Sequence, residues 1–264
     1  GEEGTIRKNL IDHNNIDAII GLPANIFFGT GIPTIIMVLR KNKRDSDVLI
    51  IDASKGFEKD GKNNKLRACD IKRIVDAYKE RPEKIEKFAR RVSRAEIVQN
   101  DYNLNIPRYV DSSEKAESWD IYASMFGGIP EAELQDLSAY WTAFPHLKAA
   151  LFSPDNEAYC HLNVQNLKNA VLSHPDVVAF KTAFQNAFGD FDAYLKSALI
   201  DGMTQLNAAG EEERLSREIF ARLAGIPLVD RYAAYQLLDD DWKKIAIDLE
   251  IIQTEGFAAT KQVD

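Results

Sequence analysis

Short runs of apolar, β-branched residues separated by turn signals characterise the first part of the chain. Ile16–Leu22, Thr34–Arg40 and Val48–Ile51 each have this pattern, which predicts three strands. Tyr102–Val110 is also predicted to be extended, but Pro107 argues against a central strand because proline cannot donate to the ladder. An α/β fold is therefore predicted for the first part of the chain.

Helical spacing follows the third predicted strand. Asp70 has the residue type of a helix N-cap, and apolar residues recur from Ile71 to Tyr78 at intervals of three or four. Pro82 ends this pattern, because a proline inside a helix removes a hydrogen bond and clashes with the preceding turn. These signals predict one helix between the third strand and Pro82.

A polar stretch separates this part from one with almost wholly helical periodicity. Asp111–Ser118 lacks an apolar period and is interpreted as a linker or exposed loop, and Pro130 occupies a position typical of a first helical turn. Further amphipathic segments, whose apolar stripes are expected to form a helical bundle core, are predicted at 162–173, 176–188, 190–208, 211–224 and 228–254. The predicted organisation is an α/β part with a basic helical extension at 1–111, a linker at 112–128 and a mainly α-helical domain at 129–264.

Composition is that of an ordinary globular protein. Of the 264 residues, 45% are hydrophobic and 28% are charged. No apolar run approaches the ~18 residues needed to span a bilayer, and the first residues lack the apolar segment of a signal peptide. Cys69 and Cys160 lie far apart without a CxxC motif, which favours reduced thiols in the cytoplasm over a disulfide framework or a zinc site. The four histidines form no metal pair at helical or finger spacing, so no metal site is expected.

Charge is unevenly distributed along the chain. The net charge is −8, divided into +4 for residues 1–111 and −12 for residues 112–264, and the segment 40–94 alone carries +8. An acidic protein with one basic segment favours local contact with a polyanion over non-specific coating of DNA. A solvated helix face is an equally good explanation of the basic segment.

The stretch Gly21–Leu39 places two adjacent aromatics in a glycine- and proline-rich loop between two predicted strands. Gly29 and Gly31 suggest a nucleotide-binding loop, but the third glycine of that fingerprint would fall at Thr34, and the loop precedes a strand instead of a helix. Asp52 ends a predicted strand, and without a preceding glycine loop a turn aspartate is favoured over a ribose-binding one. No Walker lysine motif or Gly-x-Ser-x-Gly elbow occurs, so the sequence shows no self-sufficient catalytic constellation.

Successive segments of the chain resemble, in order and spacing, landmarks of one enzyme family. The segments are 5–11, 16–23, 25–34, 48–54 and 100–111, with a looser likeness at 140–145 and 228–236. They are similar to the C-terminal part of the modification (M) subunit of type I restriction-modification systems. The resemblance implies an α/β remnant of a Rossmann-like methyltransferase domain, a helical C-terminal domain, and S-adenosylmethionine-dependent methylation of adenine N6 in DNA.

The resemblance also implies that the catalytic centre is not in this chain. The family's cofactor loop is Asp-x-Phe-x-Gly-x-Gly-like and its catalytic loop is Asn-Pro-Pro-Phe, and neither occurs here. We therefore expect a C-terminal fragment with no catalytic and no cofactor-binding residues of its own, inactive when alone. S-adenosylmethionine is expected on the intact enzyme and not on this fragment.

The resemblance assigns the aromatic loop to the target base. That base must leave the duplex to be methylated, and an aromatic side chain can then stack on it. The residues expected at this contact are Phe27, Phe28, Gly29 and Gly31, with Phe27 as the first choice and Phe28 as the second. The alternative is that the two phenylalanines close the core of the hairpin.

Basic residues after the second strand and around the predicted helix are candidates for contacts with DNA phosphates, which position DNA without reading its sequence. They are Lys41, Lys43, Arg44, Arg67, Lys72 and Arg73. For each of them alone, an exposed charge without a role is the favoured interpretation.

The family resemblance implies protein partners as well. Specificity in these systems comes from a separate specificity (S) subunit, which joins two M subunits, and a restriction subunit can join the complex. Tyr232, Tyr235 and Trp242 are the candidates for exposed interface aromatics, although core packing is favoured for each. Unpaired strand edges would also allow the fragment to self-associate. The alternative function is a non-enzymatic helical adaptor that binds a protein partner through its acidic helices.

Overall fold

The computed structural model describes residues 2–113 and 119–258. These residues belong to two compact units, Gly1–Lys115 and Ala116–Asp264, each with its own hydrophobic core. Residues 114–118 of the predicted linker lie outside the described residues. The Ser112 hydroxyl donates a hydrogen bond to Asp52 Oδ2 at 2.5 Å, so the start of the predicted linker is attached to the first unit.

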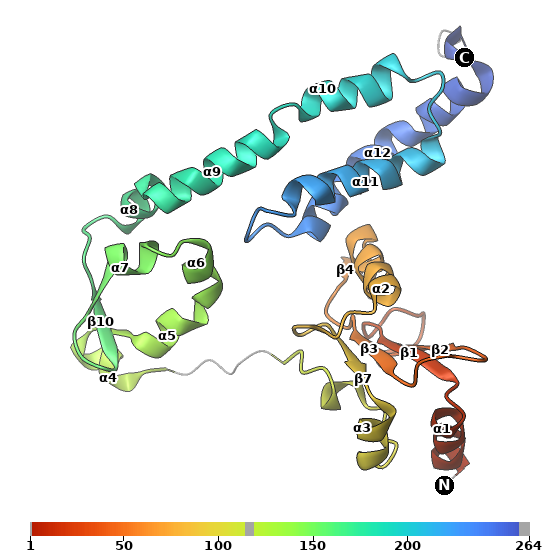
Figure 1. The fold of residues 1–264 in the computed structure, drawn as a ribbon, viewed down its shortest axis with the longest axis horizontal. Coiled ribbons are helices and arrows are strands. Elements are labelled where there is room, and N and C mark those ends of the chain that lie inside the picture. The colour runs from red at the N-terminus through yellow and green to blue at the C-terminus, as the bar shows by residue number, and fades with distance from the viewer. Residues whose placement is uncertain (1, 114–118, 259–264) are drawn as a thin grey trace. The chain divides into compact units, whose positions relative to one another are not determined.

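The first unit is built around a mixed five-stranded sheet (Figure 1). Its elements are α1 (Glu2–Asp12), β1 (Ile16–Gly21), β2 (Ile35–Leu39), β3 (Val48–Asp52), β4 (Glu58–Asp60), β5 (Asn63–Lys65), α2 (Ala68–Glu80), β6 (Lys84–Ile85), β7 (Ala89–Val92), α3 (Arg94–Gln99) and the 3₁₀ turn η1 (Ile106–Arg108). The strand order is β2-β1-β3-β7-β6, and β4 and β5 form a separate hairpin. β1 pairs antiparallel with β2 and parallel with β3, whereas β7 is antiparallel to β3 and to β6.

The three strands predicted from apolar runs are confirmed to within one residue at each end. The pattern misses β6 and β7, because these short strands carry lysine and arginine and lie toward one edge of the sheet. The segment 102–110 is not extended throughout. It contains the single turn η1, with Pro107 inside that turn, and it lies outside the sheet.

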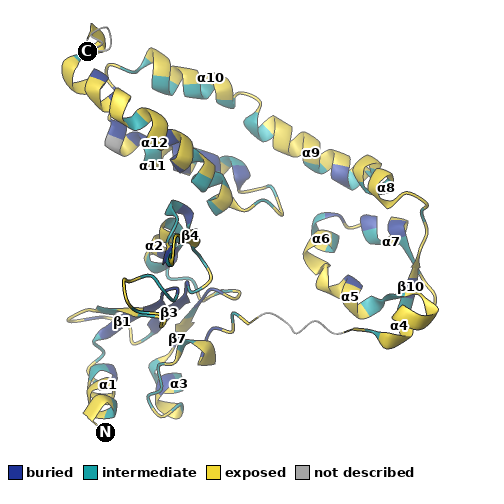
Figure 2. Ribbon diagram, turned by 180° about the vertical axis from the view of Figure 1, so that it is seen from behind, coloured by how far each residue is buried: buried dark blue, intermediate teal, exposed yellow. Residues whose placement is uncertain are grey.

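Helices cover both faces of the sheet (Figure 1). On one face Ile74 of α2 belongs to the same core cluster as Ile20 of β1. On the other face Ile11 of α1 and Ile97 of α3 share a cluster with Ile19 of β1. Strands buried on both faces have no solvent side to alternate with, so β3 is apolar up to its last residue, Asp52, and β1 is apolar except for Asp17. Both strands are buried along their whole length and are coloured dark blue in Figure 2.

Helix α2 begins earlier than its predicted cap. The N-cap residue is Arg67, and Asp70 is the third helical residue, where its Oδ2 accepts hydrogen bonds from the Arg67 backbone N–H at 3.0 Å and from Nε at 2.8 Å. The assignment of Asp70 as the N-cap is therefore wrong, because a carboxylate at this third position satisfies an open N–H from inside the helix. The predicted end is confirmed: α2 stops at Glu80, and Arg81 before Pro82 has a left-handed φ of 47°.

Asp17 on β1 is a fully buried carboxylate with several partners. The Tyr78 hydroxyl donates to its Oδ2 at 2.6 Å, and Arg81 donates to its Oδ1 at 3.0 Å. Arg40 Nε lies 3.7 Å from the same carboxylate. The hydrogen bond to Asp17, together with burial, raises the pKa of Tyr78, so the hydroxyl remains a donor at neutral pH. Pairing of this kind is what keeps a buried charge tolerable.

Replacing Tyr78 with phenylalanine is expected to destabilise the chain by about 1.5 kcal/mol, since a buried carboxylate loses one donor and water cannot replace it. Urea unfolding followed by circular dichroism measures this loss. Tyr102→Phe is the matched control, because Tyr102 donates to Asp12, whose side chain is 31% exposed and can bind water instead. Equal destabilisation by both substitutions would show that burial of the acceptor Asp17 does not increase the free energy lost with the hydrogen bond.

The second unit is mostly helical (Figure 1). Its elements are α4 (Ile121–Phe126), β8 (Ile129–Pro130), α5 (Glu131–Asp136), α6 (Ser138–Ala143), α7 (Leu147–Leu151), β9 (Phe152–Pro154), β10 (Tyr159–Leu162), α8 (Leu167–Ser173), α9 (Pro175–Phe188), α10 (Phe191–Leu195), the π-helical η2 (Lys196–Asp201), α11 (Ala208–Leu223) and α12 (Arg231–Glu255). The longest two, α11 and α12, pack on each other around a core that includes Leu215, Trp242 and Leu249.

Several details of this unit differ from the predicted pattern. Helix α4 lies inside the predicted linker 112–128, and the helix predicted at 162–173 begins only at Leu167, because residue 162 belongs to β10. A small antiparallel sheet, β8-β10-β9, interrupts the helices where none was predicted, and Pro130 belongs to it. Pro130 is consequently the N-cap residue of α5 instead of a residue of its first turn. The segment 190–208 is predicted as one helix. It contains α10 followed by the wider turns of η2, and that helical part ends at Asp201.

Candidate nucleic-acid interface

The aromatic loop, residues 22–34, connects the C-terminal end of β1 to β2. Its base is closed by the Leu22 N–H, which donates to the Thr34 carbonyl at 2.8 Å. At its tip the Thr30 N–H donates to the Phe27 carbonyl at 3.3 Å, and Gly29 has φ +75°. A turn with positive φ at its third residue favours glycine there, so Gly29 fixes the geometry of the tip.

Both phenylalanines of the loop expose their side chains. Phe28 is 92% exposed and Phe27 is 56% exposed, and neither belongs to a hydrophobic core cluster. The alternative in which the two rings close the hairpin core is therefore wrong. Phe27, Phe28 and Ile32, which is 67% exposed, together place several large apolar side chains on one short loop, and a cluster of this kind suits a binding surface.

Gly31 shows no comparable requirement. A Cβ added at this residue would meet Asn25 Oδ1 at 3.6 Å, an ordinary contact, and its φ is not positive. Its assignment to the target base stays a prediction.

The phosphate candidates that follow β2 lie at the opposite end of the β1–β2 pair from the aromatic loop. Leu39 pairs with Ile16, whereas Ile35 pairs with Gly21 beside the loop. These ends are about 17 Å apart along the strand. Lys41 and Arg44 are exposed at that far end. The structure therefore does not bring them together with the two phenylalanines.

Lys43 is not available to a phosphate. Its side chain is fully buried, and its Nζ donates to the carbonyls of Ile16 and Asp47 and lies 3.4 Å from Asp45 Oδ1. The candidate role of Lys43 is therefore corrected to a structural one. A buried ammonium needs such partners, and it holds the chain between β2 and β3 against the start of β1.

The candidates around α2 have partners inside the first unit. The two hydrogen bonds from the Arg67 side chain to Asp70, at 2.8 and 3.0 Å, raise the pKa of the guanidinium. Lys72 Nζ lies 3.3 Å from Asp76 Oδ1, and the Arg73 guanidinium lies 4.2 Å from the centre of the Phe88 ring. Contacts with DNA phosphates would compete with these interactions.

Sequence reasoning misses the lysines of the β4–β5 hairpin. Lys59, Lys62 and Lys65 are all exposed. Their spacing of three residues, on either side of the turn at Gly61, is a signal in the sequence that could have indicated them. The hairpin is hydrogen-bonded to the aromatic loop through Asn64.

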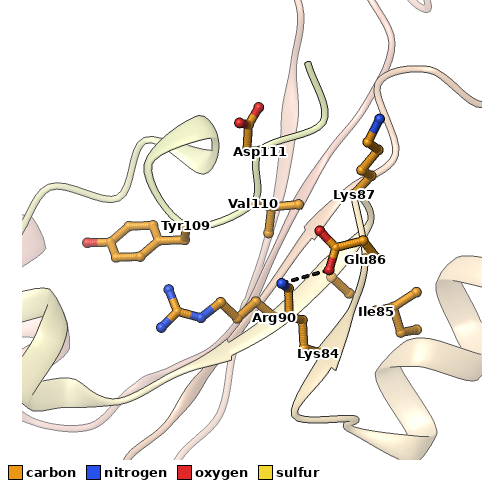
Figure 3. A pocket seen from close by; sticks show the side chains of 9 residues that line it. Lys84, Ile85, Glu86, Lys87, Arg90, Tyr109, Val110 and Asp111 are labelled. Carbon is orange, nitrogen blue, oxygen red and sulfur yellow. Dashed lines mark ion pairs between the residues drawn. The ribbon is translucent and has the colours of Figure 1, made fainter. Parts of the chain in front are cut away.

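A pocket of about 360 Å³ opens at the opposite edge of the sheet from β2, beside β6 and β7 (Figure 3). Figure 3 shows Lys84 and Glu86 facing each other, with Nζ and Oε2 2.7 Å apart. Arg90 on its wall makes two hydrogen bonds of 2.9 Å to Glu96. Lys84, Glu86 and Arg90 thus have ionic partners in the first unit, and the pocket shares no lining residue with the aromatic loop.

The remaining chemical candidates have structural explanations. Asp52 Oδ1 accepts a hydrogen bond from the Ser54 N–H at 3.0 Å, which confirms the favoured interpretation of a turn aspartate. Among residues 2–113 and 119–258, no group of three His, Cys, Asp or Glu side chains could hold a metal ion. The helices of the same described ranges include none long and apolar enough to cross a membrane.

The predicted interface aromatics of the second unit differ in burial. Trp242 is only 6% exposed and belongs to the α11–α12 core, so its assignment as an exposed interface residue is wrong. Tyr232 is partly buried, with its ring 5.5 Å from that of Phe220. Burial and the hydrogen bond from its hydroxyl to Glu212, at 2.9 Å, raise the pKa of Tyr235. The interface roles of the two tyrosines stay predictions.

Comparison with known proteins finds similarity to DNA methylases, which the family model places on the first unit and the three residues after it. The model of the N-6 DNA methylase family matches residues 1–118. The methylase subunits of the type I restriction enzymes MpnII from Mycoplasma pneumoniae and MjaVII from Methanocaldococcus jannaschii are 42% identical over 122 and 127 residues, each match covering 46% of this chain and 22% of the relative. The HindI methylase subunit from Haemophilus influenzae is 33% identical over 145 residues, or 52% of this chain and 31% of that protein. The matched chain thus spans between a fifth and a third of these relatives.

Solved structures share this similarity. Among them is the type I restriction-modification system methyltransferase subunit from Streptococcus thermophilus, with 54% sequence identity and a TM-score of 0.42. The match covers 43% of this chain and 24% of that one. The sequence matches confirm the resemblance to the modification subunit of type I systems.

Proposed function

We propose that this chain forms the C-terminal part of a type I modification subunit that methylates adenine N6 in DNA with S-adenosylmethionine. The match of residues 1–118 to N-6 DNA methylases supports the enzyme class. The observation that carries the role of this chain is the exposure of Phe27 and Phe28 on a constrained turn within the matched segment. In this proposal the first unit contacts DNA and the second joins the specificity subunit.

The aromatic loop suits a base that has left the duplex. An extruded base loses its stacking partners, and an aromatic ring can replace them for any base because every base has a π-face. A ring held on a turn with a fixed glycine loses little conformational freedom when it binds. Phe27 and Phe28 therefore supply a contact that strengthens only when the target adenine is extruded.

We infer that this chain contributes no site of its own for the cofactor. Neither the family's glycine-rich cofactor loop nor its Asn-Pro-Pro-Phe loop occurs in the sequence. The curated relatives are three to five times longer than the matched segments, which leaves room for both loops elsewhere in such a protein. We propose that catalysis and cofactor binding belong to that other part.

The edge of the sheet at β2 supports this arrangement. β2 is the outermost strand of the described sheet, and it exposes Ile35, Ile36 and Leu39 by 47 to 57%. An apolar strand edge of this kind is a template for further pairing. In the intact subunit, the rest of the methyltransferase sheet would cover it, whereas in the isolated chain a second copy could do so.

The second unit offers an apolar groove for assembly. A groove of about 680 Å³ lies among α9, α10, α11 and α12, and its walls include Phe188, Leu237 and Ile245. Leu237 is 69% exposed there. An amphipathic helix of the specificity subunit is the kind of partner that such a groove accepts, and a restriction subunit would join through the assembled complex.

Methyl transfer tests the proposal directly. The complete protein that contains this chain, assembled with its specificity subunit, is expected to transfer labelled methyl groups from S-adenosylmethionine to adenine in duplex DNA. The 264-residue chain alone is expected to transfer none. A complete protein that binds a protein partner equally well without DNA or cofactor, and methylates no DNA, would instead establish the non-enzymatic adaptor, which the acidic second unit with its apolar groove also suits.

A further inference from the structure

The β4–β5 hairpin is joined to the aromatic loop by a single buried residue, Asn64, which is 6% exposed. Its backbone N–H donates to the Asn25 carbonyl at 2.8 Å, and its side-chain Nδ2 donates to the Ala24 carbonyl at 2.7 Å. These carbonyls lie just before the two phenylalanines of the loop. Asn25 itself has a left-handed φ of 54°, so the chain turns where the hairpin holds it.

The pairing of the hairpin separates its charges onto two faces. Lys59 is directly opposite Asn64, so the two side chains lie on the same face, which is the face turned toward the aromatic loop. Glu58 is opposite Lys65 on the other face. Because side chains alternate along a strand, Asp60 also lies on that other face.

The basic groups of interest on this hairpin are Lys59, on the face turned toward the aromatic loop, and Lys62, in the turn at the tip. Lys62 follows Gly61, whose φ of +60° starts the two-residue turn at the tip. Both lysines are exposed, and within the described ranges neither forms an ion pair. Lys59 Nζ lies 5.5 Å from the centre of the Phe57 ring, a contact that leaves the ammonium accessible.

We propose that the β4–β5 hairpin binds the phosphate backbone of DNA through Lys59 and Lys62, next to the base held by the aromatic loop. This inference rests on the proposed function and adds a backbone contact to it. Phosphate contacts position the strand without reading its sequence. Contacts made next to the target base would add binding energy where extrusion costs unstacking energy. Asn64 acts as a positioning residue, because it ties the hairpin that binds the backbone to the loop that binds the base.

Salt dependence of DNA binding tests the two lysines. The assembled methyltransferase carrying Lys59→Ala and Lys62→Ala is compared with the wild type on a labelled duplex that contains the modified site, mapped beforehand in host DNA. Each phosphate contact contributes roughly −0.9 to the slope of log K against log salt, so the double variant is expected to lose about 1.8 of that slope. Lys65→Ala, on the opposite face of the same hairpin, is the matched control and is expected to leave the slope unchanged.

The possible outcomes distinguish a failure of the proposed function from a failure of the hairpin contact alone. A wild-type complex that neither binds DNA nor transfers methyl groups would overturn the proposed function and this inference with it. A wild-type complex that does both, with an unchanged slope in the double variant, would overturn the hairpin inference alone. If Lys65→Ala lowers the slope as much as the double variant does, the hairpin inference would also be overturned. DNA binding would then not depend on which face of the hairpin carries the lysine.

The positioning role of Asn64 has a readout independent of activity. Asn64→Asp keeps the size of the side chain but removes the Nδ2 donor to Ala24, so amide hydrogen exchange of residues 24–30 in the 264-residue chain is expected to accelerate. Asn63→Ala, on the other face of β5, is the control. Unchanged exchange in the aspartate variant, with β1 and β3 still protected, would show that the hairpin does not hold the loop.

Discussion

Replacing Phe27 with alanine in the assembled methyltransferase is expected to lower the rate of methyl transfer about 5- to 160-fold. Stacking of one base on one aromatic ring contributes roughly 1–3 kcal/mol, which corresponds to this range of rates if the contact is lost when the base is extruded. Initial rates with labelled S-adenosylmethionine measure the change. A fluorescent adenine analogue at the target site shows whether extrusion of the base is the step affected.

The structure also provides a stringent control in the same loop. Ile32 is 67% exposed and has no π-face, so Ile32→Ala is expected to change the rate little. Phe28 is more exposed than Phe27. If Phe28→Ala lowers the rate of methyl transfer more than Phe27→Ala does, the main stacking contact belongs to Phe28. Full activity in the double alanine variant, with DNA binding retained, would remove the aromatic loop from the base-contacting role.

The sequence predicts best the strands whose residue types are determined by burial alone. β1 and β3 are covered on both faces, and that environment selects a mainly apolar run, interrupted in β1 by Asp17, whose limits are visible in the sequence. β7, Ala89–Val92, has two arginines in its middle, and its pairing with β3 depends on residues some forty positions away. Strands of two to four residues carry too short a period to be distinguished from loops.

The candidate site shows the same limit for single residues. The sequence places Lys41, Lys43 and Arg44 together, yet the structure buries Lys43 with carbonyl partners and exposes the other two. Burial of a lysine depends on what the fold presents to it, which neighbouring residues do not reveal. Phe27 and Phe28 illustrate the converse. Apolar side chains usually indicate a core, so the residue pattern leaves closure of the hairpin core open, and the fold shows that both side chains are exposed.

Trp242 gives the second large expected effect, on stability instead of catalysis. Trp242→Ala is expected to destabilise the second unit by about 3–5 kcal/mol, because a large buried ring is replaced by a cavity in the α11–α12 core. All three tryptophans of the chain, at positions 119, 141 and 242, lie in this unit. Tryptophan fluorescence during urea unfolding therefore reports on the second unit, and Trp141 retains the signal in the variant.

Trp119→Ala is the matched control for this substitution. Trp119 belongs to the same unit but is 83% exposed, so its removal is expected to change the free energy of unfolding by less than about 0.5 kcal/mol. The same pair of variants separates core from interface, because a Trp242 that bound the specificity subunit through an exposed ring would weaken assembly without lowering stability. A small loss of stability in Trp242→Ala together with a large loss of assembly would restore the interface role that its burial argues against.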